Sequence, residues 1–159
     1  MKKIGNLIAI LTLIFASNVA NSQCALPEKI VKGTKDKGGF GVSTQSKSGA
    51  LKGGEAYEMA FIAQANMDYK ISAAMQDPSQ GTLVVELYEM VTEKDEKGNF
   101  KKEKKVISSV EQDQVIEITT DKTRKMMISV TISLEDDENK KPLCIGVLIL
   151  DKKTTIIGL

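Results

Sequence analysis

The side chains that most often carry out catalysis are scarce in this chain. It contains no His, one Arg and two Cys among 159 residues. Without His, a Ser-His-Asp triad, a Cys-His pair and an imidazole metal ligand are all impossible, and no side chain has an ordinary pKa close to neutrality. These absences exclude most enzyme chemistry, so we expect a protein that is not an enzyme and needs no cofactor.

Paired carboxylates are the remaining catalytic option, and Glu86 and Glu89 are the candidates. Such a pair can act as acid and nucleophile in glycoside hydrolysis. The two residues lie in a segment with the alternation of a strand, where positions three apart point to opposite faces of the sheet. They therefore cannot converge on one substrate, and we predict no catalytic site.

Four consecutive acidic residues, Glu135 to Glu138, are the candidate metal ligands. Ca²⁺ takes about six to eight oxygen ligands from a loop that wraps around the ion. This run lacks the alternation that such wrapping needs, and Lys140 and Lys141 compensate its charge. We therefore expect a solvated hairpin tip and no metal site.

Four aromatic residues could line a platform for carbohydrate: Tyr57, Phe61, Tyr69 and Tyr88. The whole chain has only three Tyr, four Phe and no Trp. Aromatic rings that alternate with Met, Ile and Ala suit the interior of a β-sandwich, so we favour a core role for them. The expected ligand stays open between an unknown protein and a carbohydrate.

Residues 1–22 have the pattern of a secretory signal peptide. Lys2 and Lys3 precede an apolar run from Ile4 to Ala16, and Ala20-Asn21-Ser22 offers small residues for cleavage. The apolar run is shorter than the roughly 20 residues that span a bilayer, and no later run is longer, so we expect no integral membrane segment in the mature chain. The expected protein begins at Gln23 and is exported, either periplasmic or secreted.

Lipid anchoring at Cys24 is the alternative fate of the N-terminus. It would require an aliphatic residue three places before the Cys and a small residue directly before it, where this chain has Asn21 and Gln23. A soluble exported protein is therefore favoured. Without Lys2 and Lys3, the 22 basic residues become 20 against 21 acidic ones, a net charge of −1 that predicts no nucleic-acid partner.

The two cysteines are expected to form a disulfide between Cys24 and Cys144. They are the only two in the chain, and export leads to an oxidising compartment. The bond would fasten a weakly apolar N-terminal segment to the most apolar strand. The alternative is a buried free Cys144 with Cys24 frayed or lipidated.

The elements that would position these residues are mostly strands. Residues 23–52 are rich in Lys, Gly and Ser and predict an irregular lead-in with one possible edge strand near Phe40–Thr44. Residues 53–159 alternate between apolar and polar positions, with turn signals roughly every 8 to 12 residues. This pattern predicts one all-β domain, an antiparallel β-sandwich of about seven or eight strands.

Individual segments carry this prediction. Residues 57–63 and 67–73 alternate on either side of Asn66 and suggest a hairpin, and residues 126–134 have the cleanest alternation. The apolar run 143–150 predicts a central strand buried on both faces. Charged residues 92–105 predict a long hairpin tip, and a last short strand is possible at Thr154–Ile157.

Four short motifs occur in order along the chain: Gly54–Tyr57, Asp68–Ile71, Thr123–Val130 and Cys144–Ile149. Their succession resembles small exported bacterial β-sandwich proteins of uncharacterised function, and it implies fold and export but no activity. A weaker likeness is to the pre-peptidase C-terminal sandwich modules of secreted enzymes, whose alternating Asp pattern the strand at residues 82–90 lacks. We therefore expect an exported, non-catalytic binding or structural module, or alternatively an accessory or inhibitor-like partner of a secreted enzyme.

Overall fold

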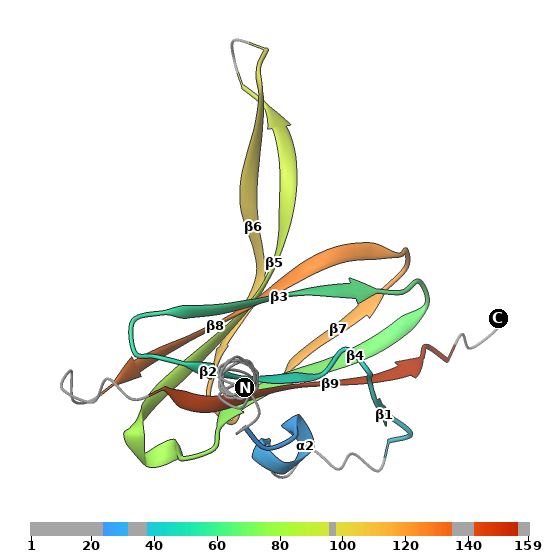
Figure 1. Ribbon diagram of the computed structural model, residues 1–159. Helices are drawn as coiled ribbons and strands as arrows, with labels where there is room; N and C mark the ends of the chain where they lie inside the picture. Colours follow the sequence, from blue (N-terminus) through green and yellow to red (C-terminus); the bar gives the residue numbers. More distant parts are fainter. Residues whose placement is uncertain (1–23, 32–37, 96–97, 135–141, 156–159) are drawn as a thin grey trace, which may run out of the picture.

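The computed structural model describes residues 24–31, 38–95, 98–134 and 142–155, which form two antiparallel β-sheets packed against each other (Figure 1). The predicted all-β sandwich is confirmed, with nine strands in the described residues instead of seven or eight. One sheet, here called the β4–β9 sheet, contains β1 (Gly41–Val42), β2 (Lys47–Leu51), β9 (Leu143–Lys153), β4 (Met67–Met75) and β7 (Ile116–Thr120). The other, the β5–β8 sheet, contains β3 (Ala56–Ala63), β8 (Arg124–Leu134), β5 (Gly81–Lys94) and β6 (Phe100–Glu111).

The core lies between the two sheets and follows the alternation of the sequence. In β8, the apolar side chains at every second position are buried, while Thr131 and Ser133 are exposed. Phe61 and Tyr69 meet edge to face across this core, with ring centroids 4.9 Å apart. The apolar run 143–150 forms most of β9, which pairs with β4 on one side and with β1 and β2 on the other, so the predicted central strand is confirmed.

The predicted hairpin between residues 57–63 and 67–73 is wrong. The two segments are β3 and β4, which lie in different sheets, because β3 pairs with β8 whereas β4 pairs with β7 and β9. Asn66, with φ of 58°, turns the chain from one sheet to the other. Both arrangements need a turn between two alternating segments, so local pattern does not distinguish them. Here the apolar faces of both segments are buried against each other in one core.

The N-terminal part of the chain contributes more structure than the sequence suggests. A short helix, α2 (Pro27–Ile30), precedes β1, which falls inside the expected edge strand, and β2 follows at Lys47–Leu51. Four of the five β2 residues are polar or small, so the segment lacks the alternation of apolar and polar residues that would predict a strand. The expected leader 1–22, the acidic run Glu135–Glu138 and the end of the segment Thr154–Ile157 lie outside the described residues.

Strands β5 and β6 extend far beyond the sandwich as a two-stranded ribbon (Figure 1). The pairing of β5 with β8 ends at Tyr88, but its pairing with β6 continues to Lys94 opposite Phe100. The described residues of the charged segment 92–105 therefore form the paired strands of the long hairpin that its composition predicts.

Candidate functional site

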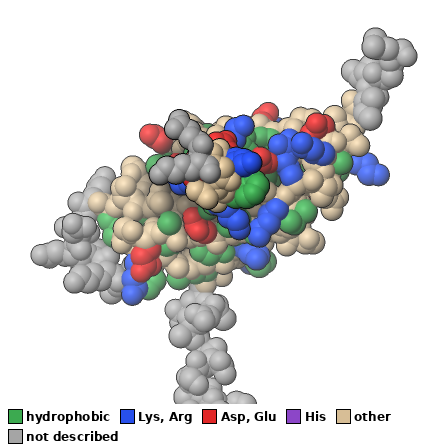
Figure 2. All heavy atoms as spheres, turned by 90° about the horizontal axis from the view of Figure 1, so that it is seen from above, with side chains coloured by type: hydrophobic (Ala, Val, Ile, Leu, Met, Phe, Trp, Pro, Cys, Tyr) green, Lys and Arg blue, Asp and Glu red, His purple; other side chains and the backbone are tan. Residues whose placement is uncertain are grey.

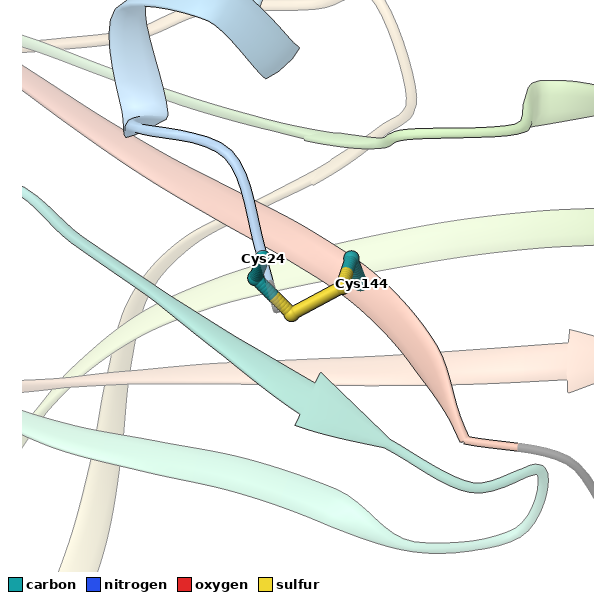
Figure 3. Close-up of a disulfide and its surroundings, with 2 residues drawn as sticks. All are labelled: Cys24 and Cys144. Atoms are coloured by element: carbon teal, nitrogen blue, oxygen red, sulfur yellow. A yellow bond between two sulfur atoms is a disulfide. The ribbon is translucent and has the colours of Figure 1, made fainter. Parts of the chain in front are cut away.

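The described segment at residues 24–31 lies on the outer face of the β4–β9 sheet, the face turned away from the core. The structure brings together the two predicted cysteines: Cys24 Sγ and Cys144 Sγ lie 2.05 Å apart, at disulfide distance, and their Cα atoms are 5.3 Å apart (Figure 3). A pair at this distance is compatible with the expected export to an oxidising compartment. It attaches the chain immediately before α2 to the start of β9.

Helix α2 packs directly on β9 because β9 has a glycine beneath it. A Cβ atom added at Gly146 would lie 3.0 Å from Ile30 Cβ and 3.2 Å from Pro27 Cα. Ile30 is buried there, and Val31 packs with Leu148 of β9 in a small second core. A single missing side chain thus allows α2 its close approach to the sheet.

A cavity of about 500 Å³ lies beside α2. Its walls come from three places: the α2 segment, the last residues of β4 with the chain that follows them, and the loop between β6 and β7. The lining residues from these walls include Lys29, Val31, Ser72, Ala74, Gln112 and Val115. The segment that begins at Cys24 is therefore one wall of the cavity.

The cavity also contains an open strand edge. Strand β7 pairs with β4 only as far as Ile71 opposite Ile116, while β4 continues to Met75. The Gln76 N–H donates to Cys144 O at 2.8 Å, and alternate residues of an antiparallel strand bond to the same neighbour. The backbone groups of Ala73 and Met75 therefore point away from β9, towards the side where β7 has ended.

No described residue forms a hydrogen bond with the N–H or C=O groups of Ala73 and Met75 on this side. Both residues line the cavity, although their side chains are in the core. Ala73 and Met75 are each only 2% exposed, so this edge is unpaired but largely covered. Unpaired strand edges are templates for pairing with another extended chain. The cavity thus offers two main-chain donors and two main-chain acceptors in the geometry of a β-ladder.

Gln112 supplies a further acceptor. Its backbone N–H donates to Leu83 O at 2.9 Å, which fixes the residue at the end of β6. The turn that follows has Asp113 at φ 67° and is closed by Gln114 N–H donating to Glu111 O at 3.2 Å. The Oε1 atom of Gln112 is buried and has no hydrogen-bond partner. Buried polar atoms are almost always paired, so this oxygen has unused capacity to accept a hydrogen bond, and Gln112 is one of the residues that line the cavity.

The two candidate carboxylates of the sequence lie outside this cavity and bind different cations. Glu86 Oε2 lies 2.5 Å from Lys104 Nζ, and Glu89 Oε1 lies 3.2 Å from Arg124 Nη1. The register places the two glutamates on opposite faces of β5, as predicted. They do not form a pair that could act on one substrate.

The candidate aromatic residues are mostly covered. Phe61, Tyr69 and Tyr88 are at most 4% exposed, and Tyr57 is partly buried against the same core. The Tyr88 hydroxyl donates to Glu58 Oε1 at 2.9 Å, and the Gln64 N–H donates to the Tyr69 oxygen at 2.8 Å. Burial raises the pKa of all three tyrosine phenols, since it disfavours the charged phenolate. These rings form no exposed platform for a sugar.

A second, shallower cavity of about 450 Å³ lies further along the same outer face, around Phe40 and Asp68. The Asp68 carboxylate accepts hydrogen bonds from the Thr119 and Thr154 hydroxyls, each at 2.9 Å. These bonds lower the pKa of Asp68, because they favour the charged carboxylate. They link β4, β7 and the end of β9, which is a structural role.

Two other features of the described residues bear on function. No three Cys, Asp or Glu side chains among them gather as a possible metal site. None of the helices in the same part of the chain is long and apolar enough to cross a membrane.

Comparison with known proteins adds no relative. No protein-family model matches the chain, and no curated protein matches it significantly.

The open edge and the role of Gln112 are not predicted by the sequence. The edge exists because β4 continues to Met75, whereas its pairing with β7 ends at Ile71. Where that pairing ends depends on how segments far apart in the chain come together. The one local signal is the polar run Gln112–Gln114 directly before the apolar start of β7. β7 begins only after that run, and Ala73 and Met75 have no partner strand on that side.

Proposed function

We propose that this protein is a non-catalytic binding module that takes an extended peptide segment of a partner protein along the open edge of β4. The unpaired backbone groups of Ala73 and Met75 inside the cavity carry this proposal. Addition of a strand to a sheet edge is a common mode of peptide recognition, in which main-chain hydrogen bonds give affinity and side-chain pockets give specificity.

The dimensions suit a short segment. The open edge runs over Ser72 to Met75, and four residues of extended chain span roughly 13 Å. The cavity volume falls within the range of about 300–1,000 Å³ that is usual for ligand pockets. We therefore propose that about four residues of the partner pair with the edge.

The polarity of the lining suits a peptide too. Peptide N–H groups would donate to the carbonyls of Ala73 and Met75 and to the unpaired Gln112 Oε1. Lys29 and Asp113 add one charge of each sign to the lining, while Val31 and Val115 supply apolar contacts for side chains. A carbohydrate is the less favoured ligand, since the lining contains no aromatic ring.

The proposal covers both expectations from the sequence. A module that takes a segment of another exported protein is a binding module, and it is also an accessory partner if that protein is a secreted enzyme. Disulfides form in oxidising compartments, so the Cys24–Cys144 pair supports an exported setting. In that setting the bond would hold α2, one wall of the cavity, against the sheet.

The proposal is tested by selecting binders from a displayed library of random linear peptides and measuring their affinity by calorimetry. Gln112→Met removes the buried oxygen and keeps the length of the side chain, so it should weaken the selected peptides about fivefold, the value of one hydrogen bond. Gln64→Met, which makes the same change at an exposed glutamine outside the cavity lining, is the control and should bind normally. Selected peptides that bind both variants equally, or no selection of peptides at all, would contradict the proposal.

A further inference from the structure

The projecting ribbon has two chemically different faces. We call it the arm and define it as Tyr88–Lys94 of β5 with Phe100–Val106 of β6, in which Tyr88 pairs with Val106 and Lys94 with Phe100. Residues opposite each other in the ladder share a face, and side chains alternate along each strand. Tyr88 and Glu89 at its base still contact the sandwich, but beyond them the arm stands clear of it, so both faces are accessible there (Figure 1).

One face combines lysines with apolar side chains and has no carboxylate among the paired residues of the arm. We call it the basic face, and its members are Tyr88, Met90, Thr92, Lys94, Phe100, Lys102, Lys104 and Val106. Contacts agree with this assignment, since Lys94 Nζ lies 6.0 Å from the centre of the Phe100 ring and Lys104 Nζ lies 4.4 Å from that of Tyr88.

The opposite face is acidic on balance. It holds Glu89, Val91, Glu93, Lys101, Glu103 and Lys105. Its charges compensate one another locally, as in the ion pair of 3.0 Å between Lys101 and Glu103. The lysines of the basic face have no such neighbours along the arm, except that Lys104 binds Glu86 at its base.

The basic face also carries exposed apolar surface. Phe100 is 77% exposed, Met90 52% and Val106 48%. Figure 2 looks down on the molecule from the side of the arm and shows lysine side chains beside hydrophobic ones at the surface. Large apolar side chains in water need an explanation when they gather on one face beside lysines, of which Lys94 and Lys102 form no ion pair with a described residue.

We propose that the basic face of the arm binds the surface of an anionic lipid bilayer. Lysines attract anionic headgroups, and apolar side chains between them enter the boundary between headgroups and acyl chains. Long lysine stems can lie along the apolar region while their ammonium groups stay at the headgroups. Phe100, next to the turn of the arm, is placed to enter first.

A bilayer fits this face better than the other anionic surfaces. A double-stranded nucleic acid held by its phosphates, or an acidic polysaccharide, would satisfy the lysines but would leave most of the apolar surface of Phe100, Met90 and Val106 in water. An acidic protein would need its own apolar patch of matching shape, whereas a lipid interface accepts both kinds of side chain without shape complementarity. The peptide cavity lies on the other sheet, so this inference is independent of the proposed function.

Flotation with lipid vesicles tests the inference. Vesicles of phosphatidylcholine mixed with phosphatidylglycerol should bind the protein at low salt, while vesicles of phosphatidylcholine alone should not. Lys94→Gln combined with Lys102→Gln should weaken binding about 25-fold, since each lysine near an anionic surface contributes roughly fivefold. Lys101→Gln combined with Lys105→Gln removes the same charge from the other face and should change binding less than about twofold.

Phe100→Trp provides a direct report of insertion, because the chain has no other Trp. Its fluorescence should shift to the blue on mixed vesicles and stay unchanged with dextran sulfate, a polyanion without an apolar region. All variants share the same N-terminus, so any contribution of residues 1–22 cancels between them. Equal losses from the two lysine pairs, no binding to mixed vesicles, or equal binding to dextran sulfate with no blue shift on vesicles would overturn the inference.

Discussion

Reduction of the Cys24–Cys144 pair should release α2 and remove one wall of the cavity. Burial of Ile30 and Val31 contributes about 2 kcal/mol each. Fixing the backbone of the seven residues from Ala25 to Val31 costs at least about 7 kcal/mol. Burial of these two side chains alone therefore falls a few kcal/mol short of holding α2 on the sheet, so we expect α2 to depend on a covalent link to Cys144.

The same link affects the free energy of unfolding. The two cysteines are 120 residues apart, and closure of a loop of that length stabilises by about 5 kcal/mol in the chain-entropy model. Since native disulfides typically contribute about 2–5 kcal/mol, we expect a loss within that range on reduction or in the double variant Cys24→Ser, Cys144→Ser.

Two measurements check this prediction. Urea unfolding with and without reductant gives the global loss, and hydrogen exchange of the Val31 amide, which donates to Pro27 O at 2.8 Å, reports the release of α2. Alkylation in denaturant should label no thiol before reduction and both cysteines after it. Two reactive thiols before reduction, or a reduced protein with unchanged stability and a protected Val31 amide, would refute the reasoning.

Three further predictions concern packing and titration. Gly146→Val should release α2 and lower the free energy of unfolding by about 1–3 kcal/mol, because a Cβ there already lies 3.0 Å from Ile30. Gly41→Ala is the control, since the atom nearest to its new Cβ is 4.0 Å away. Equal hydrogen exchange of the α2 amides in the two variants would contradict this prediction. Burial raises the pKa of all three tyrosines, so absorbance titration of the native protein should find no phenol with the ordinary pKa of about 10. The free energy of unfolding should fall as pH rises from about 10 through the raised pKa values. A phenol that titrates with the ordinary pKa would count against this prediction. Asp68→Asn should lower the melting temperature at neutral pH, and the difference from wild type should disappear as pH falls from about 4 through the lowered pKa of Asp68; a difference that persists in acid would show that the carboxylate charge is not the cause.

The sequence predicted the parts of the fold that local pattern determines. In β8, residues 126–134 alternate cleanly because one face meets the core and the other meets water. In β9, the apolar run reflects burial on both faces, although the second face is covered by α2 and Phe40 instead of by another sheet. The sequence indicates that both faces of β9 are buried, but it does not identify the segment that covers the outer face.

The site could not be predicted in the same way. The open edge depends on where β7 stops along β4, and the close approach of α2 depends on Gly146 lying beneath it in space. Both features depend on how distant segments meet in space. The local sequence of each segment is ordinary and does not indicate them. The two faces of the arm depend likewise on the pairing of Lys94 with Phe100, since a shift of one residue would exchange the faces of one strand.

Amide hydrogen exchange along β4 tests the open edge most directly. In the free protein, Ala73 and Met75 should exchange much faster than Ser72 and Ala74, whose backbone groups bond to β9. Binding of a selected peptide should slow Ala73 and Met75 selectively, as each gains a hydrogen bond. Four amides equally protected in the free protein, or no change at Ala73 and Met75 on peptide binding, would contradict a peptide site at this edge.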